Sequence, residues 1–287
     1  MGSNPSQPMG LLGPNLDPNA PIYLVYPQRF LENLLRGKLV IRSTRTWTDP
    51  YEKLVSQCGY AAIENGKIRQ HFIEKNVLPT FGQCWSTCRE SDAMWRIYSK
   101  VHQDGSALDS AFDADEAVRL RTSPQKLLNA LVGGLGIEKG GNCFIARMRY
   151  FSENALLQEI ANTIGSNREN AFSGAAGQAD ALLFKRDAFT HEQEVRLLYV
   201  DTKCEFLNQD QIEISVDPNS LIDEITVDPR VRGGQQEAWR IAWIRGLGFS
   251  NEINRSLLYQ NTLMIVPLFS QEELAKLSNS QSSPKPA

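Results

Sequence analysis

Four short apolar segments late in the chain limit its fold more than any other feature: "ALLFKRDAF", "EQEVRLLYV", "QIEISVDP" and "IDEITVDP". They are rich in β-branched and aromatic residues, and polar loops separate them, as is typical of strands. A strand, a helix and a second strand are also indicated near the start, at residues 22–26, 27–37 and 38–43. We therefore expect an α+β fold, with a mixed, largely antiparallel sheet and flanking helices.

The middle of the chain alternates helical and strand patterns. The segment "FGQCWSTC" alternates as a strand does, and the apolar residues behind it recur at helical spacing. Ser91 is expected to cap that helix. Further helices are expected at 113–121, 123–135 and 154–165, followed by a loop at 165–180.

The bulk composition argues against two classes of partner. The 287 residues carry a formal net charge of -3, which gives no bulk field for duplex nucleic acid or an anionic membrane. No apolar run approaches the roughly 20 residues of a membrane span. Five scattered cysteines suit a reducing compartment, so a cytoplasmic protein is expected. We expect a disordered leader over 1–20, a single α+β domain over 21–269 and a disordered tail over 270–287.

The stretch "THEQEVRLLYV" places two glutamates one residue apart where a strand begins. If all of it were strand, Glu192, Glu194 and Arg196 would share one face of the sheet. Two interpretations remain open. The glutamates are an active-site pair, or they lie on a solvated strand face with Arg196 as an ion-pair partner of little energetic consequence.

Four fragments together resemble the bacterial domain-of-unknown-function family 2971, which includes relatives of abortive-infection proteins: "RTWTDPYE", "CWSTCRESDAMWRIYSKVHQDG", "FKRDAFTHEQEVRLLY" and "SLIDEITVDPRV". The similarity spans about residues 22–262. Asp49 and Glu52 match the family's Asp-Pro-aromatic-Glu motif, whereas Thr48 stands where the family has Asn. Trp95 matches its Trp-containing helix.

The Glu-x-Glu strand is also similar to that of ADP-ribosyltransferases. The resemblance implies that NAD is the substrate and that the fold is ADP-ribosyltransferase-like. By position, Glu194 would hydrogen-bond the ribose and stabilise the positive charge that develops when the nicotinamide bond breaks. Glu192 would orient or deprotonate the acceptor.

Cofactor-binding candidates come from several segments: Tyr26, Ser43, Ser86, Trp95 and Arg196. The first strand departs from the transferase pattern, because it offers tyrosines where those enzymes have Arg or His. Trp95 could equally be a core aromatic. Asp49 and Glu52 could bind a ligand or cap a turn.

These features lead to an NAD-using effector of the toxin or phage-defence type, with a macromolecular acceptor and a regulatory partner that the sequence does not identify. One alternative is a metal-dependent nuclease or phosphodiesterase that uses Glu192, Glu194 and Asp49 or Glu52 as oxygen ligands. Another is a non-catalytic module that binds a nucleotide or a partner. No metal is expected in the leading hypothesis, since the Cys84–Cys88 pair has no second pair at zinc-site spacing.

Overall fold

The computed structural model describes residues 15–49, 52, 59–72, 77–101, 115–166, 172–231, 234–260 and 269–274. Of the disordered leader expected over 1–20 and the disordered tail expected over 270–287, residues 1–14 and 275–287 lie outside these ranges. The strands are β1 (Ile22–Pro27), β2 (Lys38–Ser43), β3 (Gly59–Glu64), β4 (Lys67–Phe72), β5 (Thr80–Ser86), β6 (Ala117–Thr122), β7 (Cys143–Arg147), β8 (Arg149–Phe151), β9 (Phe184–Arg186), β10 (Glu194–Val200), β11 (Gln211–Ser215), β12 (Glu224–Val227) and β13 (Glu252–Arg255).

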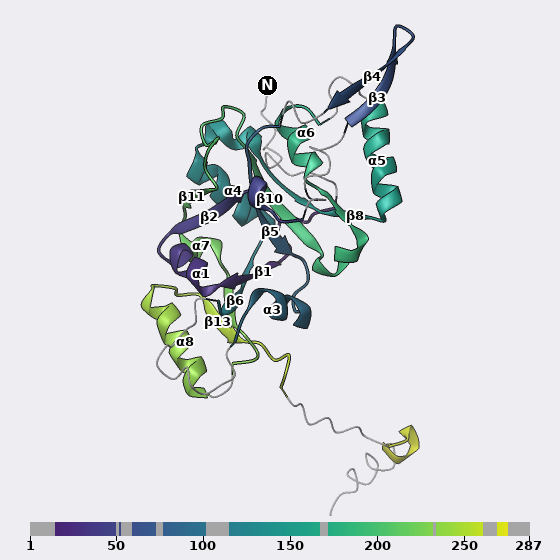
Figure 1. The fold of residues 1–287 in the computed structure, drawn as a ribbon. Coiled ribbons are helices and arrows are strands. Elements are labelled where there is room, and N and C mark those ends of the chain that lie inside the picture. Colours follow the sequence, from purple (N-terminus) through teal and green to yellow (C-terminus); the bar gives the residue numbers. More distant parts are fainter. Residues whose placement is uncertain are drawn as a thin grey trace, which may run out of the picture.

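The helices surround the sheet (Figure 1). They are α1 (Gln28–Leu35), α3 (Asp92–Tyr98), α4 (Pro124–Leu135), α5 (Glu153–Ser166), α6 (Gly174–Ala181), α7 (Pro218–Leu221) and α8 (Gly234–Gly246), with 3-10 helices η1 (Thr44–Thr46), η4 (Ile137–Asn142) and η5 (Asp187–Glu192). The expected cap of α3 is confirmed, because the Ser91 hydroxyl accepts from the backbone N–H of Met94. Within the described ranges no helix is long and apolar enough to cross a membrane.

The central sheet confirms the expected fold class. Its strands run in the order β11-β2-β5-β1-β6-β12-β13, and β10 pairs with both β5 and β7. Among the pairings of this sheet within the described ranges, only the β12–β13 pairing is parallel. The hairpin of β3 and β4 is separate and projects from the body (Figure 1).

Strand β5 lies at a split in this sheet. Along one edge it pairs with β10 over its whole length. Along the other edge it pairs with β2 at Phe81 and Gly82, and with β1 only at Ser86. Strands β1 and β2 therefore diverge beside residues 83–85, and the described pairings leave that part of the β5 edge open.

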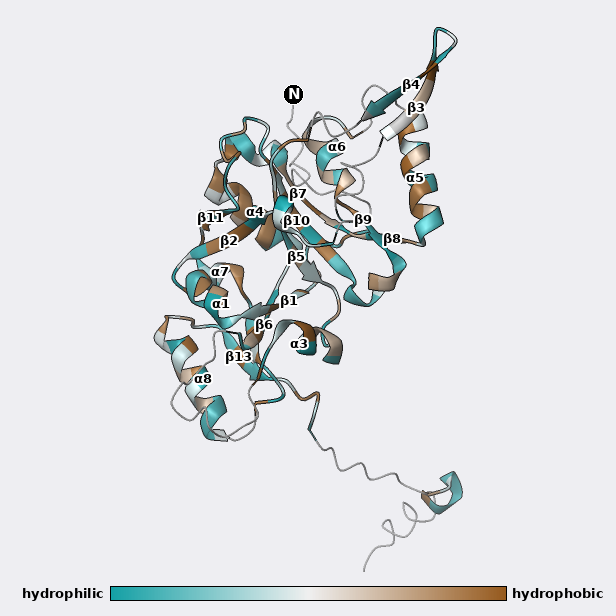
Figure 2. Cartoon of the chain, viewed as in Figure 1, coloured by the Kyte–Doolittle hydropathy of each residue, from teal (hydrophilic) through white to brown (hydrophobic). Residues whose placement is uncertain are grey.

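The two faces of the sheet pack against different helices. One face carries the largest buried cluster, in which side chains of α1, α4 and α7 meet alternate residues of the strands, such as Ile41 and Leu197. On the other face α6 packs near Leu198, and α3 packs against β1 through Trp95 and Val25. Brown, hydrophobic residues are visible on α4 and on β2 (Figure 2).

Two local expectations are wrong. Residues 117–122 form strand β6 rather than the end of a helix, because Val118 and Leu120 are buried between β1 and β12. Their alternation with Arg119 and Arg121 fits a strand once neighbours are available on both sides. The loop expected at 165–180 contains α6, whose small residues let Ala179 pack with no exposed surface.

Candidate active site

A cleft lies at the split along β5. Its volume is 480 Å³, within the range of roughly 300–1,000 Å³ that small-molecule sites occupy. Segments far apart in the sequence line it, from β1, α1, β2, η1, β5, α3, β9, the end of η5 and the start of β10. Its charged lining residues are Arg29, Arg42, Glu52, Lys185, Glu192 and Glu194.

Glu194 is the first residue of β10 and is only 3% exposed. Its Oε1 accepts from Arg196 Nε at 2.6 Å, and its Oε2 accepts from Lys185 Nζ at 2.8 Å. Burial by itself raises the pKa of this carboxyl, but the two cations outweigh burial and lower the pKa from 4.5 to about 2. Glu194 therefore carries its negative charge across the ordinary pH range.

Lys185, in β9, joins three carboxylates of the cleft. Its Nζ lies 2.6 Å from Glu192 Oε2, 2.8 Å from Glu194 Oε2 and 3.4 Å from Glu52 Oε1. Burial favours loss of the proton, but the neighbouring glutamates prevail and raise the pKa of the ammonium above its usual value. Lys185 therefore stays protonated and holds the carboxylates close together.

The two glutamates do not follow each other along a strand. Glu192 ends η5, Gln193 has left-handed backbone angles of φ 44° and ψ 49°, and only Glu194 belongs to β10. The Ser86 hydroxyl fixes this turn by donating to the carbonyl of Glu192 at 2.6 Å. The expected strand placement of Glu192 is therefore wrong, yet the turn and Lys185 still bring both carboxylates to the cleft.

Arg196 is buried beneath the cleft and does not line it. Nε donates to Glu194, NH1 donates to the Leu182 carbonyl at 2.6 Å, and NH2 donates to Glu52. Its guanidinium carbon also lies 4.3 Å from the ring centre of Trp47. Arg196 is 0% exposed, so the interpretation of this segment as a solvated strand face is wrong.

The charges of this cluster leave an excess of negative charge. Three carboxylates (Glu52, Glu192 and Glu194) face two cations (Lys185 and Arg196), so the formal sum is one negative charge. Such a buried, ordered group of opposite charges stabilises a positive charge that develops beside it, because little reorganisation is needed. The arrangement suits a reaction in which positive charge develops on the part of the substrate beside this cluster.

Aromatic side chains form much of the remaining lining. The rings of Tyr26 and Phe30 lie 5.8 Å apart, and Tyr23, Trp47, Trp85 and Tyr98 complete the set. Burial raises the pKa of Tyr26, so its hydroxyl stays neutral. Flat apolar surfaces of this kind stack on planar rings of a ligand.

Gly82 makes room for one of these rings. A Cβ at this position would lie 2.9 Å from a ring atom of Trp47 and 2.9 Å from Leu198 Cδ2. Gly82→Ala is therefore expected to lower the free energy of unfolding by about 1–3 kcal/mol, as overpacked cores do. Urea unfolding of the variant measures the change.

Gly133→Ala is the matched control, because a Cβ there meets nothing within 4 Å and the residue lies inside α4. Alanine in a helix interior is favoured over glycine by about 0.5–1 kcal/mol, so this variant should be slightly more stable than the wild type. Equal behaviour of the two variants would contradict the close packing of Trp47 over Gly82.

The other candidates from the sequence lie at different distances from the cleft. Tyr26 and Glu52 line it, whereas Ser43 and Ser86 do not. Ser43 accepts from the N–H of Arg45 and caps η1, so it shapes the loop that leads to Trp47. Asp49 forms an ion pair with Arg186 at 3.5 Å, outside the lining.

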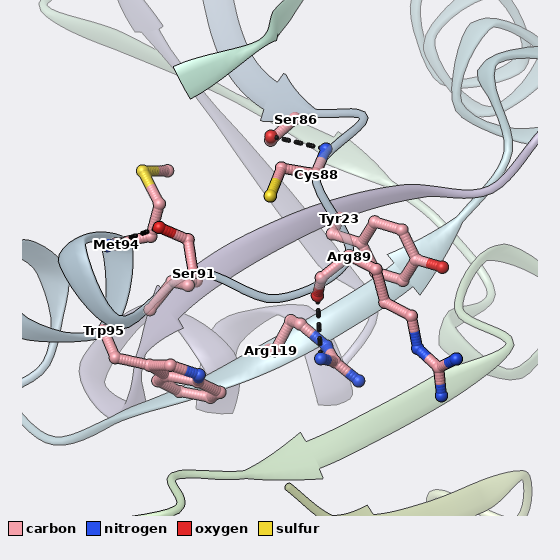
Figure 3. Close-up of a pocket in the computed structure, with 9 residues that line it drawn as sticks. Tyr23, Ser86, Cys88, Arg89, Ser91, Met94, Trp95 and Arg119 are labelled. Atoms are coloured by element: carbon pink, nitrogen blue, oxygen red, sulfur yellow. Dashed lines mark hydrogen bonds between the residues drawn. The ribbon is translucent and has the colours of Figure 1, made fainter. Parts of the chain in front are cut away.

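Trp95 lines a second, much smaller space, which Figure 3 shows between Tyr23, Ser91 and Arg119. That space measures 20 Å³, about the room needed by a water molecule. Trp95 is 1% exposed, and its indole N–H donates to Glu90 at 2.8 Å. It therefore packs in a core beside the cleft and is too deep to contact a nucleotide there.

Among the residues of the cleft that sequence reasoning missed are Lys185, Arg42 and Trp47. Lys185 lies seven residues before Glu192 in a segment that reads as an ordinary strand, so nothing local connects it with the glutamates. Arg42 is an exposed residue between the buried Ile41 and Ser43 of β2. An arginine facing outward from a core strand is the only sequence signal that could have drawn attention to it.

A metal ion would compete with the Lys185 ammonium for the carboxylates of the cleft. In the part of the chain that the structure describes, no three His, Cys, Asp or Glu side chains form a metal-binding group. The Nζ of Lys185 lies among Glu52, Glu192 and Glu194, where an ion shared by them would bind. The alternative of a metal-dependent nuclease therefore requires an ion to displace this ammonium.

Comparison with known proteins gives a distant likeness. No family model matches the chain, and no curated protein matches it, so membership of family 2971 stays a prediction. Solved structures of Thermus sp. 2.9 DarT align with it at 14% identity. The complex with ADP-ribosylated ssDNA gives a TM-score of 0.34 over 85% of this chain and 98% of that one. The complex with NAD+ gives 0.32 over 84% and 98%. Likeness at this level assigns no role to any residue here.

Proposed function

We propose that the chain is an ADP-ribosyltransferase-like enzyme that takes NAD as its substrate, of the toxin or phage-defence type. The observation that carries the proposal is the charged carboxylate of Glu194, which lines a cleft of ligand size beside a second carboxylate, Glu192. The sequence resemblance of this Glu-x-Glu pair to ADP-ribosyltransferases names the reaction. The macromolecular acceptor and any regulatory partner are left open.

The chemistry requires a negative charge near the ribose. When the bond between the ribose carbon and the nicotinamide nitrogen breaks, the electron pair leaves with nicotinamide and positive charge spreads over the ribose ring. An ionised Glu194 stabilises that charge and accepts a hydrogen bond from a ribose hydroxyl. Each carboxylate oxygen accepts more than one hydrogen bond, so the contacts of Glu194 with Arg196 and Lys185 leave capacity for the substrate.

Glu192 suits the role of orienting or deprotonating the acceptor. Its side chain is 14% exposed, against 3% for Glu194, so it is the more accessible of the two carboxylates. A carboxylate there can orient the acceptor or take its proton as the acceptor attacks the ribose carbon. The aromatic lining, with Tyr26 and Trp47, provides surfaces for the nicotinamide and adenine rings.

The proposal is tested with the purified full chain and NAD+. A ligand that binds the folded state raises its stability, by about 2.7 kcal/mol at 100 times Kd, so NAD+ is expected to raise the melting temperature. Adenine nucleotides and Mg²⁺ are included as comparison ligands. Release of nicotinamide, followed by chromatography, measures turnover.

The outcomes separate the three hypotheses. A rise in melting temperature with release of nicotinamide supports the proposal. A rise without release over many hours favours a module that binds the dinucleotide without catalysis. Cleavage of nucleic acid that needs Mg²⁺ and stops with a chelator favours the nuclease. If NAD+ neither binds nor is consumed, the proposal is overturned.

A further inference from the structure

Arg42 differs from the other cations of the cleft in its partners. Lys185 is bound to three carboxylates, and Arg29 forms an ion pair with Asp115. Arg42 is exposed and lines the cleft, and within the described residues its guanidinium forms no hydrogen bond or ion pair. A cation that lines a cleft without an acidic partner is available to bind an anionic group of a ligand.

The sheet register fixes where Arg42 lies relative to Glu194. Arg42 pairs with Gly82 on one edge of β5, and Glu194 pairs with Ser86 on the other edge. Gly82 and Ser86 are four residues apart, an even number, so both partners lie on the same face at about 13 Å along the strand. The cleft therefore has an acidic end at Glu194 and a basic end at Arg42.

We propose that Arg42 binds the diphosphate of the dinucleotide while the nicotinamide ribose lies against Glu194. This inference rests on the proposed function, since it assigns the second end of the same cleft. A guanidinium forms paired hydrogen bonds with phosphate oxygens, which makes arginine the preferred residue for this contact. The acidic cluster repels phosphate, so the two ends together set the direction in which the dinucleotide binds.

The variant Arg42→Ala tests the inference by calorimetric binding of two ligands to the full chain. NAD+ carries the diphosphate, and nicotinamide riboside carries the same ribose and ring without any phosphate. A hydrogen-bonded charge pair is worth roughly a 10- to 100-fold change in Kd, so Arg42→Ala should weaken NAD+ binding by about that factor. Binding of nicotinamide riboside should not change.

Two further variants sharpen the result. Arg42→Lys keeps the charge and should restore part of the lost NAD+ affinity. Arg36→Ala removes an exposed arginine that is paired with Glu32 outside the cleft, and it should leave both affinities unchanged. Melting curves of each variant confirm that it is folded.

Failure of this inference is distinguishable from failure of the proposed function. If wild type binds NAD+ and Arg42→Ala binds it equally well, the role of Arg42 is overturned while the proposed function stands. An equal loss of affinity for nicotinamide riboside also overturns it, because the effect would not depend on phosphate. If wild type binds no NAD+, the proposed function itself fails.

Discussion

Glu194→Gln is expected to slow release of nicotinamide from NAD+ by roughly 100- to 1,000-fold, the usual effect of removing one preorganised electrostatic group. The amide matches the carboxylate in shape but carries no charge, so it cannot stabilise the positive ribose. Binding of NAD+ should change much less, because the charge that Glu194 offsets develops only as the bond breaks. Single-turnover measurements separate the rate of bond cleavage from binding.

The matched control is Glu213→Gln, which removes an exposed carboxylate of β11 that pairs with Lys38 of β2 and does not itself line the cleft. It should leave turnover unchanged. Glu194→Asp is the second variant, in case Glu194→Gln does not fold. It keeps the negative charge opposite Arg196 and Lys185 and should retain more activity than Glu194→Gln. Equal turnover of Glu194→Gln and wild type would contradict the assignment of Glu194.

The low pKa of Glu194 also sets how the protein responds to acid. A carboxyl whose pKa falls from 4.5 when unfolded to about 2 when folded stabilises the native state above about pH 4.5. That contribution is lost progressively as the pH falls through the interval towards 2. Glu194 itself should therefore cause no loss of turnover between about pH 5 and 8, and a loss there would belong to another group.

Local patterns predicted the elements that depend mainly on their own residues. Strand β2, helix α4 and the cap at Ser91 follow from alternation, spacing and side-chain capping, and the structure has them. The local pattern indicates a helix where strand β6 lies, because the first strand partner of β6, β1, precedes it by some 90 residues. Its burial between β1 and β12 is a tertiary effect.

The site depended still more on contacts distant in sequence. The position of Glu194 at the start of a strand was predictable, because strongly apolar residues follow it. The surroundings of Glu194 could not be predicted from local patterns, because Lys185 belongs to a separate two-stranded sheet. The hydrogen bond from Ser86 to the Glu192 carbonyl likewise joins residues 106 positions apart in the sequence. The left-handed backbone at Gln193 could not be predicted either, because glutamine is not among the residues that favour turns.

The buried charges explain why this part of the molecule must be well ordered. Desolvating an ion pair costs about as much as its attraction returns, so the cluster adds little net stability. Removing one member, however, leaves the opposite charges buried without a partner. Arg196 is the member on which the arrangement depends most, since it contacts both Glu194 and Glu52 and is itself completely buried.

Arg196→Met is therefore expected to lower the free energy of unfolding by about 3–5 kcal/mol, the usual result of removing one partner of a buried pair. Methionine fills similar space but donates no hydrogen bond to Glu194 or Glu52, so both carboxylates lose a cation. The contact with the Trp47 ring also loses its cationic component. Urea unfolding, followed by tryptophan fluorescence and by circular dichroism, measures the change.

Arg36→Met makes the same chemical change at the surface, where Arg36 pairs with Glu32 at 60% and 41% side-chain exposure. An exposed pair one helical turn apart contributes only about 0.3–0.5 kcal/mol, so this variant should unfold almost as the wild type does. Because Arg196 does not line the cleft, its loss should reach NAD+ turnover only through the lining residues that it contacts, which are Glu194, Glu52 and Trp47. Turnover should accordingly fall even at temperatures at which Arg196→Met remains folded. A variant as stable as wild type would show that Glu194 and Glu52 do not need Arg196 to remain buried.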